Sequence, residues 1–217
     1  MFEKNLRVML DLQESMNQKV NPNWFALNHP WHRAIWTECA EMLEHHGWKW
    51  WKLQEPDIEQ VKLEMVDIFH FILSWAIQEY PENDDALIAI LDNMPTDSAY
   101  EADVSELIES LASSALDESL LETIYTFFTL LYELGVDYIE LYQWYVGKNV
   151  LNMFRQDHGY KQGTYQKIWN EEEDNVVLAR LLVPVYEQYG AATFAASLYL
   201  YLTEAYKEAL THNKADA

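Results

Sequence analysis

The chain has 217 residues, of which half are hydrophobic and 14% are aromatic. This composition excludes a disordered protein, and a chain of this length can bury a sizeable core. The chain has 36 acidic residues against 14 Lys and Arg, a formal net charge of −22, and this excludes a general nucleic-acid partner, because phosphate backbones require a basic surface. The single cysteine excludes an internal disulfide and is typical of a reducing, cytoplasmic setting.

No segment of the sequence is typical of export or membrane insertion. The first twenty residues are amphipathic and lack the basic start and apolar run of a signal peptide. The longest apolar segments, 69–77 and 190–202, are shorter than the ~20 residues that span a bilayer. We therefore expect no membrane partner and a cytoplasmic location.

Apolar residues recur at spacings of three and four along almost the whole chain, and no run alternates strictly. This periodicity predicts an all-α fold without strands. Gly and Pro residues set most of the expected helix ends. The expected elements are, in chain order, a helix over Phe2–Gln18, a second after Pro30 that stops at Gly47, a third from Pro56-Asp57 to before Pro81, shorter acidic helices between Asp84 and Glu133 with breaks near Met94-Pro95 and Ser113-Ser114, a long helix over Val136–Gln156, a loop with Gly159 and Gly163, and one or two C-terminal helices.

Charge is distributed unevenly along these elements. The stretch 63–147 contains eighteen Asp and Glu residues and no Lys or Arg, and four cations then follow within twenty residues. Two interpretations stay open: a solvated acidic surface whose cations pair with it, or cations concentrated where a small anion is held. We expect one domain over 1–217, with the acidic segment 81–135 as a helical excursion packed on its core.

Two pairs of carboxylates lie on successive predicted helices, Glu38 with Glu41 and Glu64 with Asp67. Residues three apart share one helix face, and the apolar neighbours of both pairs place these faces at the edge of a core. Such pairs are often only solvated, but four converging carboxylates repel one another unless a divalent cation holds them. Oxygen ligands favour Mg²⁺, with Mn²⁺ as a substitute. A ferritin-type di-iron site fits poorly, because the first pair lacks a histidine three residues on.

A second group of polar residues lies in GKNVLNMFRQDHGYKQGTYQKIW, residues 147–169. On a helix, Lys148, Asn152 and Arg155 align along one stripe, and Tyr160 and Lys161 follow in a Gly-flanked loop. Point charges, a guanidinium fork and a hydroxyl suit phosphate oxygens. Together with a carboxylate-held cation, this group indicates an enzyme that acts on a polyphosphate.

Three segments resemble the dimeric, all-α deoxyuridine triphosphatases, a family within the helical NTP pyrophosphatases that include MazG-like proteins. They are ECAEMLEHHGWKWWK, LEMVDIFHFILSW and GKNVLNMFRQDHGYKQGTYQKIWNEEEDN, and the resemblance covers roughly 1–80 and 136–178. It implies a helical bundle of the NTP pyrophosphatase type, a homodimer, and Mg²⁺-dependent hydrolysis of dUTP, or also dUDP, with dUTP giving dUMP and pyrophosphate.

The resemblance also implies roles for individual residues. The Mg²⁺ ligands would be Glu38, Glu41, Glu64 and Asp67, and Glu38 or Glu41 would deprotonate the attacking water. The phosphates would contact Lys148, Arg155, Tyr160, Lys161 and Lys167, with Asp174 and Asn175 near the same end. The nucleoside would lie near Gln13, Asn17, Trp50, Trp51, His70, Phe71, Asn149 and Asn152.

Two alternatives to dUTP hydrolysis remain at this stage. One is a related pyrophosphohydrolase acting on dCTP or a modified nucleotide. The other is a non-catalytic acidic helical protein whose carboxylates are only solvated.

Overall fold

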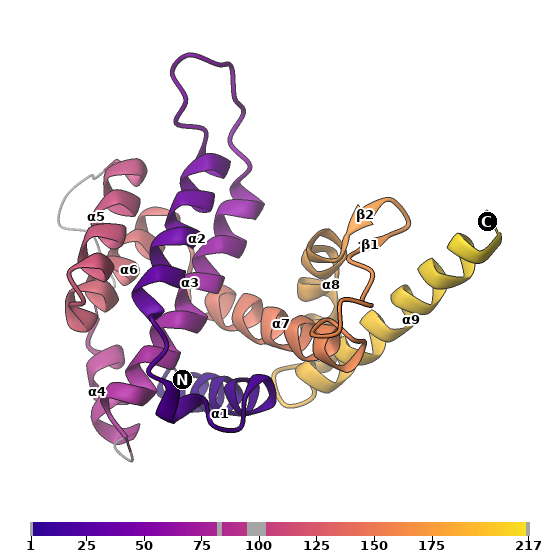
Figure 1. Cartoon of the computed structure of the whole chain (residues 1–217), viewed down its shortest axis with the longest axis horizontal. Coiled ribbons are helices and arrows are strands. Elements are labelled where there is room, and N and C mark those ends of the chain that lie inside the picture. Colours follow the sequence, from indigo (N-terminus) through magenta and orange to yellow (C-terminus); the bar gives the residue numbers. More distant parts are fainter. Residues whose placement is uncertain (1, 82–83, 95–102, 216–217) are drawn as a thin grey trace. The chain divides into compact units, whose positions relative to one another are not determined.

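The computed structural model describes residues 2–81, 84–94 and 103–215. Helices dominate these residues and confirm the predicted all-α class. In chain order (Figure 1) they are α1 Phe2–Val20, the short 3-10 helix η1 Trp24–Leu27, α2 Trp31–His46, α3 Ile58–Glu79, α4 Asp84–Asp92, α5 Val104–Leu116, α6 Leu120–Glu133, α7 Tyr138–Asp157, α8 Asp174–Tyr189 and α9 Phe194–Ala215.

The helices α2 and α3 lie side by side and are joined by the segment 47–57 (Figure 1). Gly47 ends α2 in the left-handed conformation, with φ of 86°, and its N–H donates to the Leu43 carbonyl. Asp57 caps α3 by accepting a hydrogen bond from the Gln60 N–H. The end of α2 and the start of α3 agree with the sequence-based prediction, because Gly47 and Asp57 are themselves the residues that predict these helix ends.

Packing divides the chain into two compact units, Met1–Tyr142 and Gln143–Ala217, and each is described by itself. In the first unit, α3 packs against α1, α2 and α6, while α5 packs against α2 and α6. Its core includes Phe69 and Phe127, whose rings stack with centroids 4.8 Å apart. Two helices of the acidic segment, α5 and α6, therefore pack on the helices that carry the carboxylate pairs, while α4 packs on α1. The expectation of one domain over 1–217 stays a prediction.

The acidic segment departs from the prediction at one of its two expected breaks. We expected a break near Ser113-Ser114, but α5 continues to Leu116. The Ser114 hydroxyl donates to the Leu111 carbonyl at 2.9 Å, so its hydrogen bond stays within the helix. The chain turns instead at 117–119, where Glu118 has φ of 53°. The other break was expected at Met94-Pro95; α4 ends at Asp92, and Pro95 lies outside the described residues.

The second unit contains a strand pair that the sequence did not predict. The strands β1 Ile168–Trp169 and β2 Glu172–Glu173 pair antiparallel between α7 and α8. The two residues between them both have positive φ, which is the conformation that closes tight hairpins. Trp169 is buried, and its indole N–H donates to the Gln166 carbonyl at 2.8 Å. The hairpin leads directly into α8.

Among the described residues, no helix combines the length and apolar character that crossing a membrane would require.

Candidate active site

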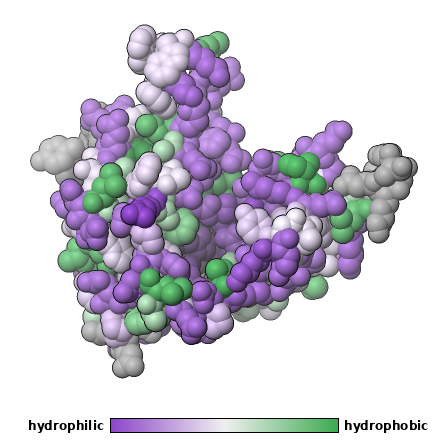
Figure 2. All heavy atoms as spheres, in the orientation of Figure 1, coloured by the Kyte–Doolittle hydropathy of each residue, from purple (hydrophilic) through white to green (hydrophobic). Residues whose placement is uncertain are grey.

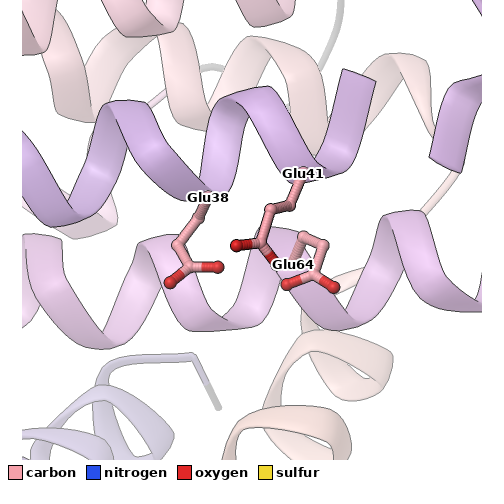
Figure 3. A group of neighbouring side chains, drawn as sticks. All are labelled: Glu38, Glu41 and Glu64. Carbon is pink, nitrogen blue, oxygen red and sulfur yellow. The ribbon is translucent and has the colours of Figure 1, made fainter. Parts of the chain in front are cut away.

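Three of the four predicted carboxylates come together between α2 and α3. Glu38 and Glu41 extend from α2 toward Glu64 on the neighbouring helix (Figure 3). Each offers a carboxylate oxygen, and these three oxygens lie within 4.8 Å of one another. Glu64 is only 8% exposed, while Ile35 and Met42 on α2 are fully buried. The cluster therefore lies at the edge of the core, as the apolar neighbours of the two pairs predicted.

The charges of the cluster act on one another. Burial is the largest cause that raises the pKa of Glu38, and with the nearby carboxylates of Asp67, Glu64 and Glu41 and a hydrogen bond to Glu64 it brings this pKa to about 8. Among the neighbouring charges that of Asp67 has the largest effect, so the fourth predicted residue lies near Glu38, although only Glu38, Glu41 and Glu64 have oxygens within 4.8 Å of one another. Oxygen donors crowded in this way fit a hard divalent cation such as Mg²⁺.

One histidine beside the cluster was not predicted as a site residue. His45 on α2 places its Nε2 3.6 Å from Oε1 of Glu64. The sequence HH at 45–46 offers no sign of which ring faces the carboxylates. Cys39, between the two glutamates of α2, is buried, and burial with the charge of Glu38 raises the pKa of its thiol to about 12. This thiol is not a nucleophile.

A group of amides and hydroxyls joins α1 to the second half of α3. Gln13, which is buried, places Oε1 2.7 Å from Nδ1 of His70 and donates through Nε2 to Asn17 Oδ1 at 3.0 Å. The structure therefore brings together three residues predicted near the nucleoside. A fourth residue, Ser74, lies at the centre of this group. Its hydroxyl accepts hydrogen bonds from Gln13 at 2.8 Å and from Asn17 at 3.0 Å. Ser74 was not predicted as a site residue, because a serine within FHFILSW is typical of an ordinary helix interior.

Phe71, also predicted near the nucleoside, has a tryptophan neighbour from an unexpected element. The ring centroid of Trp31, the first residue of α2, lies 6.3 Å from that of Phe71. Trp50 and Trp51, which were predicted in this role, contact one another in the segment before α3. At 1.5 Å per residue, Phe71 lies about 20 Å along α3 from Ile58, the first residue of that helix. The structure brings Phe71 together with Trp31 and not with these two tryptophans.

The segment between α2 and α3 is exposed. Trp50 is 88% exposed and Leu53 is 92% exposed. At the tip of this segment, at the top of Figure 2, white and green atoms stand out from the purple of the surrounding surface. An ion pair between Lys49 and Glu44 joins the start of this segment to α2. Trp50 and Trp51 are therefore exposed in this structure.

In the second unit, Arg155 on α7 is bound by residues at the start of α8. Its Nε and Nη2 each donate at 2.8 Å to Asp174, which has no exposed surface. Nη2 also donates to Asn175 at 3.2 Å, and Nη1 donates to Asn152 at 3.1 Å. The fork that was predicted to bind phosphate therefore binds a buried carboxylate in this structure.

Two further polar residues extend this group. Lys148, which is 3% exposed, donates to Asn175 at 3.3 Å. Tyr165 donates its hydroxyl to Asp174 at 2.7 Å, and burial together with this bond raises the pKa of that hydroxyl. Tyr165 was not predicted; it lies in the predicted segment 147–169, but its partner follows the hairpin. Asn149, on α7, is buried as well.

The remaining predicted phosphate ligands lie on the surface of the second unit. Tyr160 is half exposed, and the Arg155 guanidinium lies 5.9 Å from its ring centroid. Lys161 is exposed, and Lys167 forms an exposed ion pair with Glu173 at 3.4 Å. Such exposed pairs exchange partners at little cost, so Lys167 is available to an anionic ligand.

A helical fold with a carboxylate cluster, an amide group and a set of cations is typical of an enzyme that acts on nucleotides. Residues 5–160 match the family described as dUTPase, and the chain belongs to that family. It is therefore a dUTP diphosphatase, a nucleoside triphosphate pyrophosphohydrolase, and the non-catalytic alternative is superseded. No curated protein matches the chain. The match includes the carboxylates and amides but ends before Tyr165, Lys167 and Asp174.

Proposed function

We propose that the chain hydrolyses dUTP to dUMP and pyrophosphate in a reaction that depends on Mg²⁺ held by Glu38, Glu41, Glu64 and Asp67. The observation that supports this most directly is the carboxylate cluster between α2 and α3, where burial and neighbouring charges raise the pKa of Glu38 to about 8. Mg²⁺ would neutralise charge on the phosphates and lower the barrier to attack. Mn²⁺, with similar ligand preferences, is expected to substitute.

The attacking water needs a base, and we assign this role to Glu38 in preference to Glu41. Both extend from one face of α2, but Glu41 is exposed while Glu38 is half buried and hydrogen-bonded to Glu64. A buried, hydrogen-bonded carboxylate is better oriented to accept a proton from water. No covalent intermediate is required, since water is the nucleophile.

The two ends of the substrate need different partners. On the nucleoside side, Gln13 and Asn17 offer amides, and His70, Phe71 and Trp31 lie along the same stretch of the first unit. Contacts of the phosphates with Lys148, Arg155, Tyr160, Lys161, Lys167 and Asn175, and of the nucleoside with Asn149 and Asn152, stay predictions from the resemblance.

Three finer points complete the proposal. We expect dUDP to be accepted, a homodimer, as the resemblance implies, and a cytoplasmic location, which the lone buried Cys39 supports. The acidic surface supports the absence of a nucleic-acid partner. A contribution of Trp50 or Trp51 to the nucleoside pocket stays a prediction.

The experiment is a panel of dUTP, dCTP, dTTP and dATP with pyrophosphate release as the readout, each with Mg²⁺, with Mn²⁺ and with excess EDTA. The proposal expects dUTP to be the preferred substrate and EDTA to abolish turnover. Preference for dCTP would favour the related pyrophosphohydrolase. Turnover that survives EDTA would contradict the role of the carboxylate cluster.

A further inference from the structure

Ser74 occupies the centre of the amide group and is 1% exposed. Its Oγ lies 2.8 Å from Nε2 of Gln13 and 3.0 Å from Nδ2 of Asn17. It also lies 2.9 Å from the carbonyl oxygen of His70, one turn earlier on α3, and 3.3 Å from Oδ1 of Asn17. One hydroxyl therefore contacts both amides and the backbone.

A serine hydroxyl has one hydrogen and two lone pairs. The shortest bond that uses this hydrogen is the bond to the His70 carbonyl. The lone pairs then accept one N–H from Gln13 and one from Asn17. In this arrangement every contact within 3.0 Å of Ser74 Oγ joins a donor to an acceptor.

Rotating the amides by half a turn breaks this match. If both were reversed, Oε1 of Gln13 and Oδ1 of Asn17 would face Ser74, and with the His70 carbonyl three oxygens would compete for one hydrogen. If Asn17 alone were reversed, its Nδ2 would face Nε2 of Gln13 at 3.0 Å, donor against donor. Ser74 thus holds both amides in one orientation.

In that orientation Asn17 offers a donor to a ligand. Asn17 is half buried, and its Nδ2 uses one of two hydrogens on Ser74. The hydrogen bonds among the described residues leave the second hydrogen for an incoming acceptor. Uracil carries an acceptor, O4, where cytosine carries an amino donor, so the two bases differ at the atom that such a hydrogen would meet.

We propose that Ser74 is a positioning residue that determines specificity, and that it excludes dCTP by preventing Asn17 and Gln13 from rotating into the orientation that accepts cytosine. This inference rests on the proposed function, because it assumes that Asn17 reads the base. Without the hydroxyl, both amides reverse together, since the His70 ring accepts or donates at Nδ1 according to its tautomer.

The experiment compares kcat/KM for dUTP and dCTP in the parent and in Ser74→Ala. The expected result is a fall of about tenfold or more in the preference for dUTP. The change should appear mainly in KM, while kcat for dUTP stays within about threefold, because the carboxylates are untouched. Ser74→Cys, which keeps most of the volume but is a weak acceptor, provides the same comparison if the alanine variant does not fold.

The matched control is Ser114→Ala. Ser114 is also a buried serine of the first unit, but its hydroxyl donates only to the Leu111 carbonyl of its own helix. Its preference for dUTP should equal that of the parent. If the Ser74 variants lose activity on both nucleotides in parallel, or keep the parental preference, the inference is overturned. Failure of the proposed function is separate, since it would appear as a parent that does not hydrolyse dUTP.

Discussion

Arg155 and Asp174 form a two-point ion pair that joins the last turn of α7 to the first turn of α8. Nε and Nη2 of the guanidinium each lie 2.8 Å from a different oxygen of the carboxylate. Asp174 is completely buried and also lies at a helix N-terminus, where the helix dipole favours negative charge. A ligand that needs the same edge of Arg155 must displace Asp174 or bind beside it.

We predict that Arg155→Lys destabilises the protein by about 1–3 kcal/mol, because an ammonium cannot satisfy both oxygens of a buried carboxylate. We also expect kcat/KM for dUTP to fall by about tenfold or more. The measurements are urea unfolding and steady-state kinetics. Arg180→Lys is the control, since Arg180 forms an exposed pair with Glu172 at 2.9 Å and should lose less than about 0.5 kcal/mol. Equal stability of both variants would contradict the importance of the fork.

Replacing one member of the carboxylate cluster should separate activity from stability. In Glu41→Ala or Asp67→Ala we expect turnover to be lost, since a cation ligand is missing. The metal-free protein should be as stable as the parent or more stable, because repulsion among the carboxylates is relieved. Pyrophosphate release and thermal unfolding in EDTA measure the two effects. Glu44→Ala, an exposed glutamate of the same helix, should keep its activity. Near-normal turnover of either cluster variant at saturating Mg²⁺ would remove that residue from the site.

The cluster should also make stability depend on pH. The pKa of Glu38 is about 8 in the folded protein, against an ordinary value of 4.5. Between these values the folded protein keeps a proton that the unfolded chain has released. This contribution to stability is complete below pH 4.5 and is lost as the pH rises through 8.

In EDTA, Glu38→Gln should therefore lose less stability than the parent between pH 5 and pH 9, as measured by thermal unfolding at each pH. Added Mg²⁺ should raise the Tm of the parent more at pH 8 than at pH 5, because protons compete with the cation for the carboxylates. Parallel pH profiles for the parent and Glu38→Gln would show that this carboxyl is not perturbed in the folded protein.

Two sets of tryptophans are candidates for contact with the nucleoside, Trp31 on α2 and the pair Trp50 and Trp51 before α3. Trp31 lies beside Phe71, whereas Trp50 lies on an exposed tip. We predict that dUMP changes the intrinsic fluorescence, and that Trp31→Phe removes most of this change while Trp50→Phe and Trp51→Phe do not. The measurement is a fluorescence titration of each single variant, with the KM for dUTP as a second readout. Loss of the signal in Trp50→Phe or Trp51→Phe would return the role to the segment before α3.

Features that depend on neighbours in sequence could be predicted well. Gly47 and Asp57 identify the end of α2 and the start of α3, because each is a capping residue by its own chemistry. Carboxylates three apart on a helix share a face, so the pairing of Glu38 with Glu41 followed from spacing alone. That these two would meet Glu64 required only that two consecutive helices pack together.

Features that depend on distant partners could not be predicted. The pair of Arg155 with Asp174 spans a hairpin whose turn adopts positive φ at Asn170 and Glu171, neither of which is a glycine. The role of Ser74 depends on the packing of α1 against α3, which brings Gln13 into contact with it. The two serines at 113–114 predicted a helix break that the structure does not have. The helix continues there, because the Ser114 hydroxyl donates to a carbonyl of its own helix.

The most direct test of the account is ³¹P NMR of dUTP incubated with the protein, with and without Mg²⁺, for the parent and for Glu41→Ala. We predict that the parent with Mg²⁺ converts the triphosphate signals to those of dUMP and pyrophosphate, and that neither the metal-free parent nor the Glu41→Ala protein does so. Release of orthophosphate with dUDP, or equal conversion by Glu41→Ala, would contradict it.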